Sequence, residues 1–133
     1  MIPFRVPFEP GSPIYEQVVY AATKAILSGD MQPGERFPSV RALSQELKIN
    51  PNTAHKVIGE LVSAGLLEVH PGLGTVVAKP PPSTAADRSQ LLQSEVERLV
   101  VEARRLGISL QSLLVSIEDH WRRLKPEPVK GRQ

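Results

Sequence analysis

The chain has 133 residues, enough for one domain with an appendage or two very small domains, and 41% of them are hydrophobic, which suffices for a core. It has no cysteine, which excludes disulfides, thiolate metal sites and a cysteine nucleophile and fits a reducing cytosol. The net charge is +2, but residues 1–80 carry seven basic and seven acidic side chains, so bulk charge there does not argue for nucleic acid.

The N-terminal arm shows no export signal. "MIPFRVPFEPGSP" lacks a basic stretch followed by an apolar one, and no run in the chain approaches the ~18 apolar residues that span a bilayer. We therefore expect a cytoplasmic protein. Ser12 is the expected N-cap of a first helix, with Gly29 as its stop and apolar residues at helical spacing: Ile14, Val18, Ala21, Ala22, Ala25 and Ile26.

Two further helices are predicted after the turn-rich connection "MQPGERFP". Ser39 is expected to cap a short helix in which Val40, Leu43 and Leu47 share one face. After the link "KIN", Asn50 and Pro51 predict the start of a longer helix that ends near Gly65. Its apolar stripe consists of Ala54, Val57, Ile58, Leu61 and Val62. Two helices joined by a short turn predict a helix-turn-helix.

The opposite face of the longer helix is polar and allows two interpretations. It carries Asn52, Lys56, Gly59 and Ser63, flanked by Thr53 and His55. Such a face is ordinarily solvated, yet these side chains also suit base edges and phosphates. Gly59 costs ~0.5–1 kcal/mol relative to alanine in a helix, which favours either close approach of another backbone or a helix–helix contact.

A β-hairpin is predicted in "LLEVHPGLGTVVAK". Leu67 and Val69 alternate with Glu68 and His70, residues 71–74 indicate a turn, and residues 75–78 are rich in β-branched side chains. The fold class is therefore mainly α with a small β-hairpin: a winged helix-turn-helix domain over residues 10–79, followed by a short two-helix C-terminal dimerisation arm.

The C-terminal part is predicted to hold two amphipathic helices. A Pro-rich linker at 80–86 marks the domain boundary, residues 87–125 contain a helix at 87–106 and a second one capped by Ser109, and residues 126–133 form an expected disordered tail. Two such helices cannot enclose a core, so their stripes must pack on the winged domain, a second copy or a partner. A homodimer is the most economical arrangement. Its candidate residues are Leu92, Val96, Leu99, Ala103, Leu106, Leu113, Leu114, Ile117 and Trp121.

Catalytic patterns are missing from the sequence. His55, His70 and His120 match no zinc spacing, and neither a nucleophile elbow nor a phosphate-binding loop is present. We expect no enzyme activity, no metal and no cofactor.

Three stretches carry a family resemblance: "PIYEQV", "GDMQPGERFPSVRALSQELKINPNT" and "GLLEVHPGLGTVV". Together they resemble the GntR family of bacterial transcription regulators, and the short C-terminal part looks like its YtrA subfamily. The resemblance implies a homodimer that binds a palindromic operator in double-stranded DNA and usually represses its own operon, often one for an ABC transporter. The short C-terminal part leaves any small-molecule effector at the dimer interface or absent.

The resemblance also implies site residues. It assigns DNA contacts to Arg41, to Asn50, Asn52 and Thr53 at the start of the longer helix, to Lys56 one turn later, and to Gly72 at the tip of the hairpin. The full candidate DNA-binding set is Arg36, Ser39, Arg41, Asn50, Asn52, Thr53, His55, Lys56, His70 and Gly72. His70 and Pro71 stand where relatives commonly carry arginines. The alternative function is a winged-helix adaptor that binds proteins without sequence-specific DNA binding.

Overall fold

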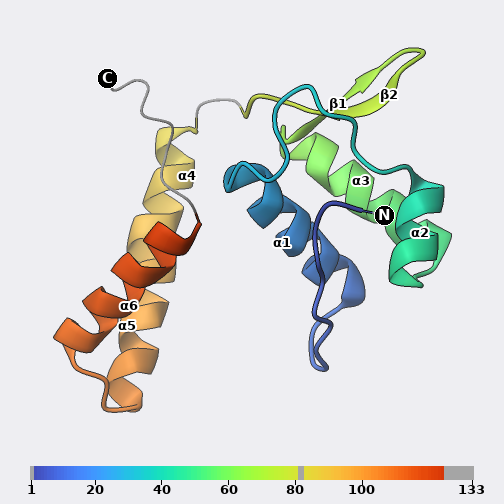
Figure 1. The fold of residues 1–133 in the computed structure, drawn as a ribbon. Helices are drawn as coiled ribbons and strands as arrows, with labels where there is room; N and C mark the ends of the chain where they lie inside the picture. Colours follow the sequence, from blue (N-terminus) through green and yellow to red (C-terminus); the bar gives the residue numbers. More distant parts are fainter. Residues whose placement is uncertain (1, 81–82, 125–133) are drawn as a thin grey trace. The chain divides into compact units, whose positions relative to one another are not determined.

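The structure, a computed structural model, describes residues 2–80 and 83–124. The predicted tail at 126–133 and residues 81 and 82 of the predicted linker lie outside the described residues. The chain divides into two compact units, Met1–Pro80 and Pro81–Gln133, which we call the N-terminal and C-terminal units. The order of elements is α1–α2–α3–β1–β2 in the first unit and α4–η1–α5–α6 in the second (Figure 1).

Three capped helices form the body of the N-terminal unit: α1 (Ile14–Leu27), α2 (Val40–Leu47) and α3 (Pro51–Ser63). The Ser39 hydroxyl accepts from the Ala42 amide at 3.0 Å, and the Asn50 side chain accepts from the Asn52 amide at 2.7 Å, so both predicted caps are confirmed. The predicted cap at Ser12 is wrong. Pro13 holds the N-cap position of α1 without a side-chain hydrogen bond, and the helix begins at Ile14.

The hydrophobic core lies where α1 and α2 pack against α3. Ala54, Val57 and Leu61 of α3 have no exposed surface, as the helical period predicted. Ile14 is an exception in the α1 stripe, since it is 49% exposed at the first turn. The remaining core residues are Val18, Ala22, Ala25, Ile26, Met31, Phe37, Leu43, Leu67 and Val77.

The N-terminal arm packs on this core. Ile2, Phe4 and Val6 are half-buried against it, and the rings of Phe4 and Phe37 stack with centroids 6.0 Å apart. Gln17 ties the end of the arm to α1, because its side chain accepts from the Glu9 amide at 2.9 Å and donates to the Glu9 carbonyl at 2.8 Å. The arm therefore belongs to the N-terminal unit, although the motifs alone placed the start of the domain at residue 10.

The hairpin consists of β1 (Leu67–His70) and β2 (Gly74–Val77), paired antiparallel from Leu67↔Val77 to His70↔Gly74. Leu67 and Val77 enter the core, but Val69 is 65% exposed because that end of the hairpin extends past the core. The alternation in the sequence correctly placed Val69 on the same face of the hairpin as Leu67, but it did not predict that Val69 is exposed.

Residues 34–37 extend the hairpin on its other side. The amide of Gly34 donates to the Val77 carbonyl, the amide of Val77 to the Glu35 carbonyl, and the amide of Phe37 to the Thr75 carbonyl, each at 2.8 Å. Arg36 and Val76 form an antiparallel bridge. The sequence indicated only a turn-rich connection here, since a strand partner 40 residues away leaves no local pattern.

The C-terminal unit contains α4 (Ala85–Ser89), the π-helical η1 (Gln90–Glu95), α5 (Val96–Arg105) and α6 (Leu110–Arg123). The single helix predicted at 87–106 is therefore a nearly continuous run from Ala85 to Arg105 with a π segment inside it. It starts earlier because Thr84 and Asp87 form a capping box. Gly107 (φ +74°) and the Ser109 cap separate α5 from α6, as predicted.

The C-terminal unit encloses no core of its own. Among its described residues, 83–124, only Ala103 is buried. Apart from Ala103 and the half-buried Leu113, the stripe residues of α5 and α6 are exposed, for example Leu99 at 43%, Ile117 at 43% and Trp121 at 67%. On α5, Arg105 pairs with Glu102, which lowers the pKa of the Glu102 carboxyl and raises that of Arg105. Across the described ranges, no helix has the length and apolarity to cross a membrane.

Candidate nucleic-acid interface

The polar face of α3 is available to a ligand. Asn52, His55, Lys56 and Gly59 are exposed and Thr53 is half-buried, while the opposite face fills the core. Asn50 has a structural role at the start of this face, since its side-chain oxygen is occupied by the Asn52 amide. The amide nitrogen of the Asn50 side chain can still donate elsewhere, and its oxygen has a second lone pair that can accept.

Lys56 is held by an aromatic ring from another helix. Its ammonium nitrogen lies 3.9 Å from the centroid of the Tyr15 ring, at the N-terminal end of α1. Such a cation–π contact at a partly exposed site is worth ~0.5–1 kcal/mol and restricts a flexible side chain. Sequence reasoning missed this pairing, although Tyr15 lies within the "PIYEQV" motif.

Gly59 has open space around it. A Cβ built on it would meet no atom within 4 Å, apart from its own helix's backbone. Within residues 2–80, the glycine therefore makes no helix–helix contact. The other predicted role of Gly59, close approach of another molecule's backbone, is compatible with this open space.

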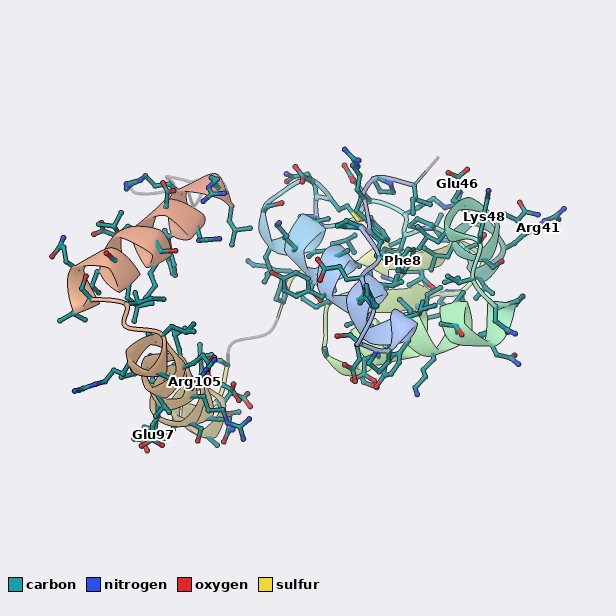
Figure 2. All side chains as sticks on the ribbon, turned by 90° about the horizontal axis from the view of Figure 1, so that it is seen from below. Phe8, Arg41, Glu46, Lys48, Glu97 and Arg105 are labelled. Carbon is teal, nitrogen blue, oxygen red and sulfur yellow. The ribbon has the colours of Figure 1, made fainter. Side chains whose placement is uncertain are left out.

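Arg41 projects from α2. It is the second residue of the helix, directly after the Ser39 cap and Val40, and Figure 2 shows its side chain extending away from the N-terminal unit. No described residue forms a hydrogen bond or an ion pair with its guanidinium. At the other end of α2, Lys48 is exposed in the left-handed conformation (φ +56°) and adds a second cation in the turn before α3.

The wing, residues 67–77, has a tight tip and one acid–histidine pair. Gly72 (φ +78°) makes the turn, and nothing lies within 4 Å of the position its Cβ would take. His70 Nε2 lies 2.8 Å from Glu68 Oε1. Arg36 reaches the same hairpin, because its Nη2 lies 3.9 Å from where a Cβ of Gly74 would be.

All ten candidate residues belong to the N-terminal unit, and all are exposed except the half-buried Thr53. The structure brings some of them together locally: Asn50 with Asn52 through the cap, and Arg36 with the wing. Ser39 is exposed, but its hydroxyl is engaged by the Ala42 amide. Within residues 2–80 and 83–124, no three His, Asp or Glu side chains cluster in a way that would hold a metal ion.

Comparison with known proteins gives a consistent result. Residues 14–77 match the family model described as bacterial regulatory proteins, gntR family. The transcriptional repressor YtrA of Bacillus subtilis is 32% identical over 77% of this chain and 79% of its own. The transcriptional regulator Rv1152 of Mycobacterium tuberculosis is 30% identical over 79% and 83%. A crystal structure titled transcriptional antiterminator, from Listeria monocytogenes, superposes with a TM-score of 0.81 at 21% identity, covering 93% of both chains.

Three helices, the third with a solvent-facing polar side, and a two-stranded wing form a winged helix-turn-helix. Together with the family match, this fold defines a regulator of transcription, a class of DNA-binding proteins without enzyme activity. The chain belongs to the GntR family, and its similarity to YtrA along most of both sequences assigns it to the YtrA subfamily.

Proposed function

We propose that the protein is a homodimeric repressor that binds a palindromic operator in double-stranded DNA, in the bacterial cytoplasm. The observation that carries this is the polar face of α3, presented by a helix whose other face is locked into the core. In a helix-turn-helix dimer, the two recognition helices enter successive major grooves ~34–36 Å apart. Repression is inferred from the similarity to YtrA, which is named a transcriptional repressor.

The candidate residues divide into two roles in this proposal. Asn52 and Lys56 read base edges or clamp phosphates, and Arg41 contacts phosphate or guanine from the start of α2. Asn50 and Thr53 contact the sugar–phosphate backbone beside the cap. These positions follow the exposed surface of α2, α3 and the turn between them.

The exposed stripes of the C-terminal unit form the dimer interface in this proposal. An isolated chain would leave Leu99, Leu114, Ile117 and Trp121 in water, which favours burial against a second copy. A symmetric pair is self-complementary, so one stripe serves both protomers. We therefore assign the apolar stripes of the described residues 87–124 to dimerisation.

The direct test is a fluorescence-anisotropy titration of the protein on duplex DNA from the gene's own upstream region and on a scrambled duplex. We expect the upstream duplex to bind ~10³-fold more tightly or better, the usual range for specific recognition. Equal, weak binding to both duplexes would contradict an operator in that region. A stable hetero-partner together with no DNA preference would establish the adaptor role instead.

Replacing Lys56 by alanine should weaken operator binding and flatten its salt dependence. If each ammonium neutralises one phosphate, the slope of log K against log salt changes by about 0.9 per protomer. Lys24→Ala is the matched control, since Lys24 lies in the last turn of α1, at the opposite end from Tyr15. The measurement is anisotropy between 50 and 200 mM salt, and an unchanged slope would remove Lys56 from the site.

Replacing Gly59 by alanine should change folding and binding in opposite directions. The helix interior gains ~0.5–1 kcal/mol of stability because alanine is the better helix former and nothing obstructs its methyl group. Operator affinity should fall if DNA approaches this backbone closely. Urea unfolding and anisotropy on the same sample test both parts. Greater stability with unchanged affinity would show that Gly59 faces water in the complex.

A further inference from the structure

The outer face of the wing extends onto the loop before α2. Directly paired residues of an antiparallel sheet present their side chains on the same face. Val76, which is only 2% exposed, pairs with Glu68 on one side and bridges to Arg36 on the other, so these three residues share a face. Of the three, Glu68 and Arg36 are exposed. His70 and Gly74 form the next pair on that face, two positions along. Leu67 and Val77 lie on the opposite face, which enters the core.

Among the residues that the structure describes, Arg36 provides the only guanidinium or ammonium group of this outer face. Residues 67–77 contain no lysine and no arginine. The one acid on the face, Glu68, is 2.8 Å from His70. Arg36 is exposed, and no described residue forms a hydrogen bond or an ion pair with its guanidinium. Its charge is therefore free to meet a ligand.

Gly74 leaves the space into which Arg36 extends. The Arg36 Nη2 atom lies 3.9 Å from the position of a Cβ at Gly74, whose φ of +105° suits glycine. The guanidinium thus lies beside the first residue of β2, next to the tip formed by residues 71–73. A hairpin tip with an adjacent guanidinium has the chemistry to bind an anion beside a groove.

We propose that Arg36 acts as a residue of the wing and binds a phosphate of the DNA backbone there. This inference rests on the proposed DNA-binding function and specifies the chemistry of one part of that site. A guanidinium forms paired hydrogen bonds with phosphate oxygens and keeps its charge at any physiological pH. The wing hairpin contains no lysine or arginine of its own and acquires a cation from residues 34–37, the third extended segment beside β2.

The test compares Arg36→Gln, Arg36→Lys and wild type on the upstream and scrambled duplexes. Phosphate contacts carry no sequence information, so Arg36→Gln should weaken both complexes by the same factor. It should also reduce the salt slope by about 0.9 per protomer, and Arg36→Lys should retain the slope. Lys24→Gln, which removes an exposed ammonium from the last turn of α1, is the charge-matched control and should leave both affinities unchanged.

Hydroxyl-radical footprinting locates the contact. Arg36→Gln should lose protection at the flank next to the wing and keep the protection over the recognition helix. Folding is monitored by thermal melting, which should not shift, because the third segment is held by backbone hydrogen bonds of residues 34, 35 and 37.

The outcomes separate this inference from the proposed function. The phosphate contact is overturned if Arg36→Gln leaves the salt slope unchanged, or if it weakens binding only to duplexes with particular base pairs. Operator binding would stand in either case. Equal binding of wild type to both duplexes, with a slope that Arg36→Gln reduces, overturns the operator and supports the contact. A wild-type protein that binds neither duplex overturns both.

Discussion

Ile117→Glu is expected to convert the protein to a monomer and to lower operator affinity by ~10²–10⁴-fold, the range over which linking two binding modules raises avidity. Ile117 is 43% exposed in the middle of α6, within the stripe that we assign to the dimer interface. A glutamate there would bury an unpaired charge at each symmetry-related contact, which an apolar interface cannot accommodate. Sedimentation equilibrium measures the assembly state, and anisotropy measures the affinity.

A matched variant makes this test specific. Gln111→Glu adds the same charge at an exposed polar position of the same helix and should leave the dimer intact. Binding to a duplex that contains a single half-site should be unchanged in Ile117→Glu, because the N-terminal unit has a separate core. A dimer that survives Ile117→Glu at micromolar concentration would show that the α6 stripe packs against something else.

Arg41→Ala should reduce operator affinity by roughly 30-fold or more, because a guanidinium contact to a base is worth about 1–3 kcal/mol and the dimer loses two of them. Stability should stay within about 0.5 kcal/mol of wild type, since the exposed Arg41 side chain has no polar partner in the described part of the chain. Urea unfolding establishes the second point and anisotropy the first.

Arg41→Lys distinguishes a base contact from a phosphate contact. Lysine keeps the charge but loses the planar pair of donors, so a guanine contact would remain broken while a phosphate contact would largely recover. Binding of Arg41→Ala equal to that of wild type would place α2 away from the DNA and would falsify this part of the site.

The two strongest effects arise from different units of the chain. The Arg41 variant changes a surface that the N-terminal core supports by itself, and the Ile117 variant changes a surface that needs a second molecule. The Lys56 and Gly59 variants test α3, which lies in the same unit as Arg41. A variant of one unit that left the function of the other intact would support independent folding of the two units.

Local signals in the sequence were sufficient to predict most helices. Ser39, Asn50 and Ser109 accept hydrogen bonds from amides two or three residues away, so a cap is determined within one turn of chain. The apolar period of α3 likewise predicted which face enters the core. The Thr84–Asp87 capping box was equally readable and would have placed the start of α4 correctly.

The family and the class of protein also followed from sequence. The motifs that resembled GntR regulators lie at the start of α1, from the connection through α2 to the first turn of α3, and in the wing, and the matched region runs from residue 14 to residue 77. The helical period alone separates the polar face of α3 from the core. The side-chain types on that face then predicted hydrogen bonding to base edges and phosphates.

The contacts between distant segments were decided only by the tertiary structure. The packing of Phe4 on Phe37, the position of Lys56 over Tyr15 and the third extended segment beside β2 each join residues more than 30 positions apart. No local period or cap encodes such pairs, since they form only when α1, the α1–α2 connection and the wing share one core. The sequence by itself therefore determined the helices, the polar face and the family, whereas the fold decided that Lys56 lies over Tyr15 and that Arg36 belongs to the wing.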